Sequence, residues 1–149
     1  MRPVPARWYL VRHGETEWNR TDRAQGHADV PLNDAGRSQA EALAKALACP
    51  RFDAAITSDL SRATETARIV LRDSPPTPAV TPDLREISFG GWEGYTYPDA
   101  ERENPALFAK LVSADPSFIA PGGESFEQLS ARVQVFAERT RASHPEGAV

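Results

Sequence analysis

A cation, an imidazole and a glycine stand in a row at Arg12, His13 and Gly14. They follow directly on four apolar residues, 8–11, which show no polar alternation. Such a run is typical of a strand buried on both faces of a parallel sheet. Because ligands bind at the carboxyl ends of strands in open α/β sheets, the triplet is expected to face a binding site. A solvated arginine beside a capping histidine is the alternative interpretation.

The overall composition indicates one domain without a basic face. The chain has 149 residues and a net charge of -4, so we expect neither nucleic acid nor an anionic membrane as a partner. A single cysteine, Cys49, excludes an intramolecular disulfide and is expected to be inert core. The chain shows no apolar stretch of signal-peptide or membrane-span length, which predicts a cytoplasmic protein.

Hydrophobic periodicity predicts strands that alternate with helices, as in a parallel sheet with right-handed crossovers. The expected elements are a helix opened by Asn33 and Asp34 and ended by Pro50, a strand over 54–58, a helix carrying the apolar stripe of 60–71, a strand over 79–81, short helical pieces over 99–103 and 106–112, and a long helix opened by Ser125 and Gln128. Residues 13–32 are expected to form an ordered loop anchored by Trp18, and 95–121 an insertion that covers a site.

The second helix brings another cation to this arrangement. Thr57, Ser58 and Asp59 are its candidate N-caps. Arg62 lies in the first turn, off the apolar stripe, where it could bind an anion together with the free N–H groups of the helix N-terminus. A solvated helix charge is the alternative.

Five stretches of the chain carry a resemblance to a known family. They are RHGETEWN (12–19), QGHADVPLNDAGRSQA (25–40), SDLSRATETA (58–67), LREISFGGWEG (84–94) and PGGES (121–125). In this order they resemble the histidine phosphatase family, the phosphoglycerate-mutase-like group. The resemblance implies an α/β fold: a three-layer sandwich with a mostly parallel sheet flanked by helices. It also implies one domain over 1–149 with a cap-like insertion over 95–121.

The resemblance also assigns the chemistry. It makes His13 the nucleophile that attacks phosphorus and becomes a phosphohistidine, because a neutral imidazole nitrogen attacks without prior deprotonation. Arg12 and Arg62 correspond to the phosphate clamp, since guanidinium matches phosphate oxygens bidentately. Glu86 corresponds to the proton donor to the leaving oxygen, a role that requires it to be protonated when substrate is bound. An ordinary acidic residue in a polar turn is the alternative for Glu86.

Three loop residues are expected near the phosphate. Asn19 matches a phosphate contact of the family, and Gln25 and Gly26 are expected beside it. Ordinary loop stabilisation is the alternative for all three. The chain carries neither paired cysteines beside its histidines nor a Walker A or GxGxxG motif, so no metal and no cofactor is expected.

One family feature has no counterpart here. Family members carry a second histidine in a serine-histidine-glycine motif at the end of a later strand, and neither His27 nor His144 matches it. The missing strand should lie beside residues 8–11, so we expect an exposed apolar edge there. The chain is interpreted as a C-terminally truncated form that lacks the family's C-terminal strand or strands.

These features predict a metal-independent phosphomonoester hydrolase of a small-molecule substrate. The stretches FGGWEG and PGGES resemble the phosphatase branch, which includes the α-ribazole phosphatases. The alternatives are a phosphoglycerate-type mutase and, because the second histidine is absent, an inactive pseudoenzyme or phosphate-binding fragment. The sequence predicts no oligomeric state.

Overall fold

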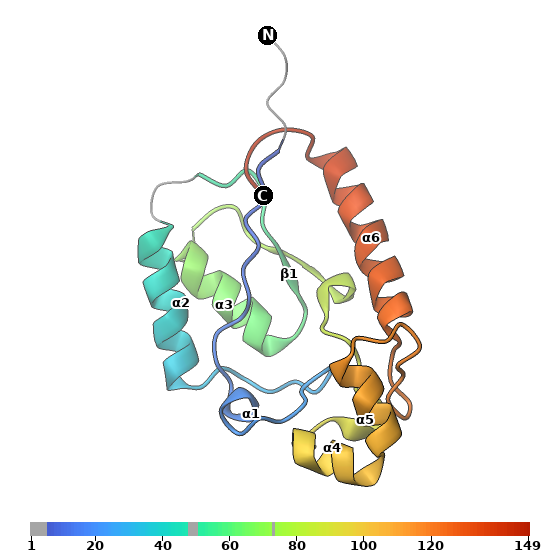
Figure 1. Ribbon diagram of the computed structural model, residues 1–149. Helices are drawn as coiled ribbons and strands as arrows, with labels where there is room; N and C mark the ends of the chain where they lie inside the picture. Colours follow the sequence, from blue (N-terminus) through green and yellow to red (C-terminus); the bar gives the residue numbers. More distant parts are fainter. Residues whose placement is uncertain (1–5, 48–50, 73) are drawn as a thin grey trace.

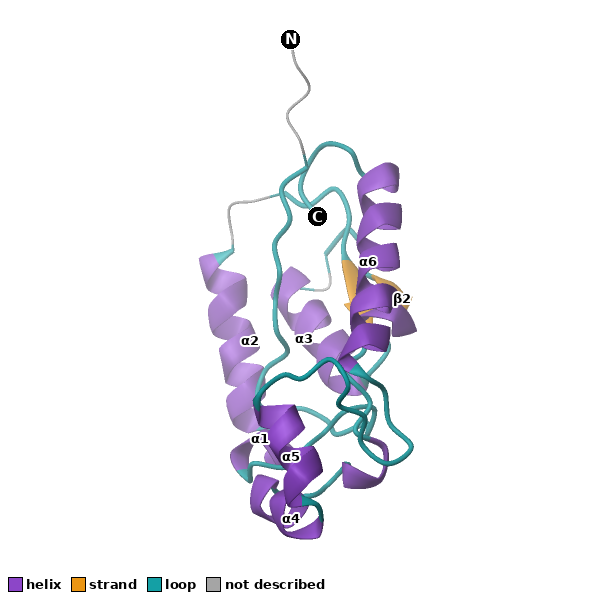
Figure 2. Ribbon diagram, turned by 45° about the vertical axis from the view of Figure 1, so that its right-hand side comes forward, coloured by secondary structure: helices purple, strands orange, loops and turns teal. Residues whose placement is uncertain are grey.

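The molecule is built in three layers (Figures 1 and 2). The structure is a computed structural model that describes residues 6–47, 51–72 and 74–149. In chain order its elements are α1 (Glu17–Arg20), α2 (Asp34–Ala46), β1 (Ile56–Ser58), α3 (Ser61–Leu71), β2 (Ala79–Thr81), the 3-10 turns η1 (Pro82–Leu84) and η2 (Gly90–Trp92), α4 (Tyr97–Glu103), α5 (Pro105–Val112) and α6 (Phe126–Ser143). The expected Cys49 and Pro50 lie outside the described residues.

A thin central layer separates the helices. Helices α2 and α3 lie on one side of it and α6 on the other (Figure 1). The central layer contains residues 6–13 and the strands β1 and β2, which pair in parallel with Ile56 opposite Ala79. The predicted α/β sandwich is therefore confirmed, and β2 has the bounds that the sequence predicted.

Side-chain caps explain where most helices begin. The Asn33 side chain accepts from the Gly36 amide at 2.8 Å at the start of α2. Ser125 and Gln128 form the expected capping box of α6, because each side chain accepts from the other's backbone amide. The capping prediction for α3 is wrong. Its N-cap is Leu60, without a side-chain hydrogen bond.

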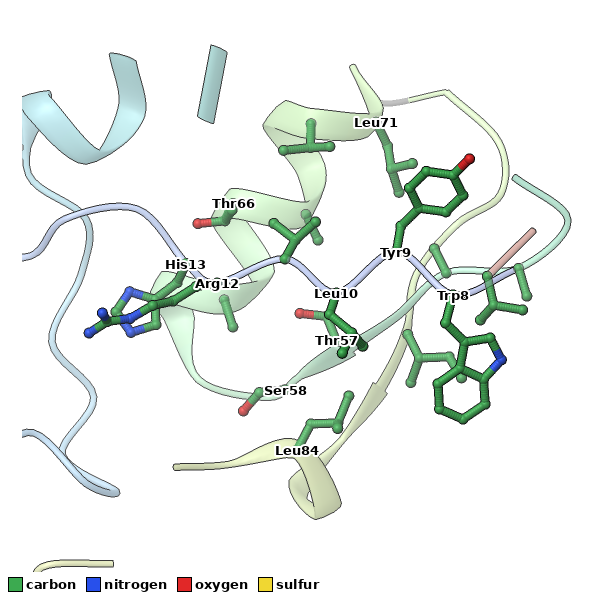
Figure 3. Close-up of a pocket in the computed structure, with 18 of the residues that line it drawn as sticks. Trp8, Tyr9, Leu10, Arg12, His13, Thr57, Ser58, Thr66, Leu71 and Leu84 are labelled. Carbon is green, nitrogen blue, oxygen red and sulfur yellow. The ribbon is translucent and has the colours of Figure 1, made fainter. Parts of the chain in front are cut away.

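The prediction for residues 8–11 is also wrong, because they are not buried on both faces. Leu10 is 89% exposed and Val11 is 45% exposed. Pairing in this layer reaches only the first part of the segment: a parallel bridge joins Arg7 to Ala148, and the Tyr9 amide donates to the Val149 carbonyl at 2.8 Å. The expected exposed apolar edge is present. Beside it a cavity of about 450 Å³ opens between this segment, β1 and α3 (Figure 3).

The loop after His13 is ordered and contains the short helix α1, which the sequence analysis did not predict. Trp18 anchors this loop by packing against Gly94. Helices α4 and α5 lie at the same end of the molecule (Figure 1). They pack on an apolar cluster in which Trp92 is 1% exposed and Phe118 is fully buried. Residues 95–121 are therefore built on the same core as η2.

Two glycines let the His13 segment approach α2. A Cβ atom built on Gly14 would lie 2.3 Å from the carbonyl oxygen of Gly36, and one built on Gly36 would lie 2.1 Å from the carbonyl oxygen of Glu15. Both contacts are with backbone, which cannot move aside as the end of a side chain can. The strand exit that carries His13 is therefore fixed against the first turn of α2.

This contact predicts the result of a substitution. Gly14→Ala is expected to lower the free energy of unfolding by about 1–3 kcal/mol or more, the usual cost of overpacking. Urea unfolding followed by circular dichroism measures it. Gly91→Ala is the matched control, because the nearest neighbour of its new Cβ is 3.4 Å away. Equal midpoints for the two variants would show that the close approach is not needed.

Candidate active site

His13 stands at the end of the apolar segment with its tautomer fixed. Its Nδ1 lies 2.7 Å from the carbonyl oxygen of Gly14. Because a carbonyl oxygen only accepts, Nδ1 carries the proton and Nε2 of the neutral ring keeps its lone pair. Burial lowers the pKa of His13. The Gly14 carbonyl raises that pKa, Arg62 and Arg12 lower it, and Glu86 raises it. The ring is therefore held neutral, with one nitrogen available as a nucleophile.

Helix α3 holds the backbone beside this histidine. The Gly14 amide donates to Thr66 Oγ1 at 3.1 Å, and the Thr66 hydroxyl donates to the Arg62 carbonyl at 2.7 Å. Thr66 is buried. The sequence analysis missed this residue, because a threonine one turn after Arg62 carries no signal that a glycine 52 positions earlier will bind it. Through Thr66, α3 fixes the distance between His13 and its own first turn.

Arg62 is enclosed in the protein and is not a solvated helix charge. It is 2% exposed. Its Nη1 donates to the Ala28 carbonyl at 2.7 Å and its Nη2 to the Gly26 carbonyl at 2.8 Å. Desolvation by burial lowers the pKa of Arg62, and the nearby carboxylates of Glu86, Asp29 and Glu93 raise it. Two of its five N–H donors hold the loop, so three remain for a further acceptor such as an anion.

Arg12 and Glu86 complete the group around His13. Both line the same cavity as His13 and Arg62, and both act electrostatically on the imidazole. Arg12 is exposed, and it lies with His13 at one end of the cavity, while Trp8 lies at the other (Figure 3). The Glu86 side chain is exposed, and its Oε1 accepts from the Ile87 amide at 2.9 Å. The fold thus brings together the four residues predicted to be catalytic.

The predicted phosphate-binding loop residues also hold the loop together. The Asn19 Oδ1 accepts from the Thr16 amide at 3.1 Å in the capping box of α1, which leaves Nδ2 to donate elsewhere. The Gln25 Oε1 accepts from the hydroxyl of Thr16, which is fully buried, at 2.7 Å. Gly26 adopts a φ of 52°, and its carbonyl binds Arg62. Phosphate binding by Asn19, Gln25 and Gly26 stays a prediction.

The other two histidines have structural contacts. His27 Nε2 donates to the Glu86 carbonyl at 3.0 Å, and its own amide donates to Glu93 Oε1 at 2.8 Å. His144 is the C-cap of α6.

Across residues 6–47, 51–72 and 74–149, no three His, Cys, Asp or Glu side chains are grouped as a metal site would need. In the same described residues, no helix combines the length and apolar character needed to cross a membrane.

Comparison with known proteins decides the family. The sequence model of the histidine phosphatase superfamily (branch 1) matches residues 8–149. The chain belongs to this superfamily. Two relatives and one solved structure illustrate the similarity. The chain is 36% identical over 136 residues to the adenosylcobalamin/alpha-ribazole phosphatase of Salmonella typhimurium, covering 91% of this chain and 67% of the relative. It is 38% identical over 138 residues to phosphoglycerate mutase-like protein 4 of Arabidopsis thaliana, covering 91% of this chain and 60% of the relative.

A solved structure shows the same fold. The crystal structure of the alpha-ribazole phosphatase from Shigella flexneri superposes with a TM-score of 0.85 at 34% identity, covering 95% of this chain and 70% of that chain. This histidine phosphatase chain therefore spans 60% to 70% of the length of these relatives. The family match over residues 8–149 includes the segments that carry the predicted site.

The environment of His13 predicts a titration below the ordinary imidazole value of 6.5, because burial disfavours the charged ring. Between the lowered pKa of the folded chain and 6.5, the unfolded chain binds more protons at His13 than the folded chain does. The neutral ring therefore contributes stability that is present above pH 6.5 and is lost as the pH falls through the folded pKa. Titration of the His13 ring followed by NMR measures the midpoint, with the urea-unfolded chain as control. A folded midpoint at or above that of the unfolded chain would contradict the prediction.

Proposed function

We propose that this histidine phosphatase hydrolyses a phosphomonoester of a small molecule through a phosphohistidine, without a metal ion. The observation that carries the proposal is the fixed tautomer of His13, whose Nδ1 is bound to the Gly14 carbonyl at 2.7 Å. That bond directs the lone pair of Nε2 away from its own backbone. Arg12 and Arg62 supply permanent positive charge beside it, which suits the oxygens of a phosphate.

The first step transfers the phosphoryl group to the enzyme. Arg12 and the remaining donors of Arg62 hold the phosphate oxygens while His13 Nε2 attacks phosphorus. The N–P bond forms as the bond from phosphorus to the leaving oxygen breaks, and Glu86, protonated in the substrate complex as this role requires, gives its proton to that oxygen. An alcohol leaves, and a phosphohistidine and the Glu86 carboxylate remain.

The second step uses water. Glu86, now a carboxylate, accepts a proton from the attacking water, whose oxygen bonds to phosphorus as the N–P bond breaks. Inorganic phosphate leaves, and His13 and Glu86 return to their starting protonation states. Because permanent guanidinium charges balance the transferred phosphoryl group, no step requires a metal ion.

The names of two of the three relatives support hydrolysis over mutase chemistry, and the third relative keeps the mutase as a second candidate. The substrate is expected to enter beneath residues 95–121, which we propose as a cap over the site. With one cysteine in the chain, a reducing cytoplasm is the compartment we propose.

Phosphate release from p-nitrophenyl phosphate in the presence of a chelator tests the proposal. Turnover that is insensitive to the chelator is the expected result. Product analysis with 3-phosphoglycerate separates the alternatives, since conversion to the isomer without release of phosphate would establish a mutase. Tight binding of vanadate without turnover of any ester would instead establish a phosphate-binding pseudoenzyme.

A further inference from the structure

One arginine of α6 binds the backbone of the segment that carries Glu86. Arg132 Nη1 donates to the Asp83 carbonyl at 2.7 Å and to the Arg85 carbonyl at 3.1 Å. Its Nη2 reaches the Glu86 carbonyl at 3.5 Å. A single guanidinium group thus contacts three carbonyl groups within four consecutive residues.

The same guanidinium is fixed by a carboxylate from the PGGES stretch. Arg132 Nε and Nη2 donate to the two oxygens of Glu124 at 3.0 and 2.8 Å. Only 20% of the Arg132 side chain and 16% of the Glu124 side chain are exposed. Glu124 is in turn bound two residues beyond Glu86 in the sequence, because its amide donates to the Ser88 carbonyl at 2.9 Å. All five N–H donors of Arg132 therefore have an acceptor in this arrangement.

The position of the Glu86 carboxyl group depends on the backbone of residues 83–87. The side chain is exposed, and its hydrogen bond is to the amide of the next residue, Ile87, at 2.9 Å. A shift of the backbone over 83–87 would therefore carry the carboxyl group with it. The carbonyl of Glu86 also accepts from His27 Nε2 at 3.0 Å.

We infer that Arg132, held by Glu124, is the positioning residue for Glu86: it fixes the backbone over 83–86 so that the Glu86 carboxyl group faces the leaving oxygen. The inference rests on the proposed function for the role of Glu86. Arg132 itself contacts backbone and Glu124, so it acts through another residue. Lysine cannot replace it, because an ammonium group has no planar fork to reach one carboxylate and three carbonyl groups at once.

Substrates with different leaving groups test the inference. A simple alkyl phosphate needs a proton on its leaving oxygen, whereas a dinitrophenolate leaves without one. Arg132→Lys is expected to lower kcat on the alkyl ester by about 10- to 100-fold, the scale of a displaced catalytic group. The same variant should lower kcat on dinitrophenyl phosphate by less than about 3-fold, since general acid catalysis contributes little there. KM should hardly change.

Arg139→Lys is the matched control. Arg139 lies two turns further along α6 and binds the side chain of Asp83, not the carbonyl groups of the segment. It is expected to leave the ratio of the two activities unchanged. Glu124→Gln keeps the acceptor but removes the charge, and it should shift the ratio in the same direction as Arg132→Lys, by less.

A second measurement does not depend on turnover. The Ile87 amide donates to the Glu86 carboxyl group, and local opening controls its hydrogen exchange. This exchange should accelerate by about 10-fold or more in Arg132→Lys and not in Arg139→Lys. Equal losses on both esters, or unchanged exchange at Ile87, would overturn the inference. Failure of the proposed function would appear differently, as absence of turnover on both esters in the unaltered protein.

Discussion

Phosphate release is expected to stop when His13 is replaced by alanine. Removal of the nucleophile of a covalent enzyme typically lowers kcat by on the order of 10⁴-fold or more. The reason here is specific to the ring, because the Nδ1 bond to the Gly14 carbonyl leaves Nε2 as the atom that can reach phosphorus. Steady-state kinetics on p-nitrophenyl phosphate with chelator present measures the loss.

His144→Ala is the matched control for this result. His144 caps α6 with its backbone, and it lies outside the group of residues around His13, so the same change of residue type should leave kcat within about 2-fold. Circular dichroism and thermal unfolding of both variants show whether the fold is kept. Turnover by a folded His13→Ala variant at the rate of the unaltered protein would remove His13 from the mechanism.

The second large effect is expected at Arg62. Arg62→Met should lower kcat/KM by about 10²- to 10³-fold, the usual cost of losing one preorganised donor to a developing charge. It should also lower the free energy of unfolding by roughly 1–3 kcal/mol, because the Gly26 and Ala28 carbonyls lose their donor inside the protein. The two effects are measured by kinetics and by urea unfolding of the same preparation.

Arg102→Met provides the comparison for Arg62. The Arg102 side chain is 74% exposed and pairs with Asp99 within α4. Its loss should change neither the free energy of unfolding nor the activation free energy derived from kcat/KM by more than about 0.5 kcal/mol. An Arg62→Met variant that is destabilised but fully active would leave Arg62 a purely structural role.

Local patterns were sufficient to predict much of the fold. The spacing of Ser125 and Gln128 predicted the start of α6, and Asn33 that of α2, because a capping bond joins residues three positions apart. The capping pair Thr16 and Asn19 in the first loop has similar spacing, and it could have predicted α1.

Long-range contacts explain the failures. Asp59 was a candidate N-cap of α3, but its carboxylate binds the Arg85 guanidinium, 26 residues away, through two hydrogen bonds, the first at 2.7 Å. A sequence pattern for helix capping, which spans a few residues, cannot predict a partner so far along the chain. The exposure of Leu10 likewise depends on which strands pair beside it, and not on the apolar residues around it.

The sequence predicted which residues form the candidate site, but it predicted few of the contacts that hold them in place. The family motifs placed His13, Arg12, Arg62 and Glu86 together, and all four line one cavity. The sequence could not show that Arg62 is buried against the loop, that Thr66 fixes the Gly14 amide, or that a guanidinium from α6 binds the backbone of Glu86. Each of these contacts joins residues more than 30 positions apart, where tertiary packing decides the partner.

The proposed mechanism requires a covalent bond between phosphorus and His13, and this bond can be trapped. The protein is mixed with an aryl phosphate, quenched in alkali, digested and analysed by mass spectrometry, with His13→Ala treated in parallel. The expected result is a phosphoryl group on the peptide that contains His13, stable in alkali and lost in acid, and none in the variant. Turnover without label on His13, or label on another residue in both proteins, would contradict the phosphohistidine mechanism.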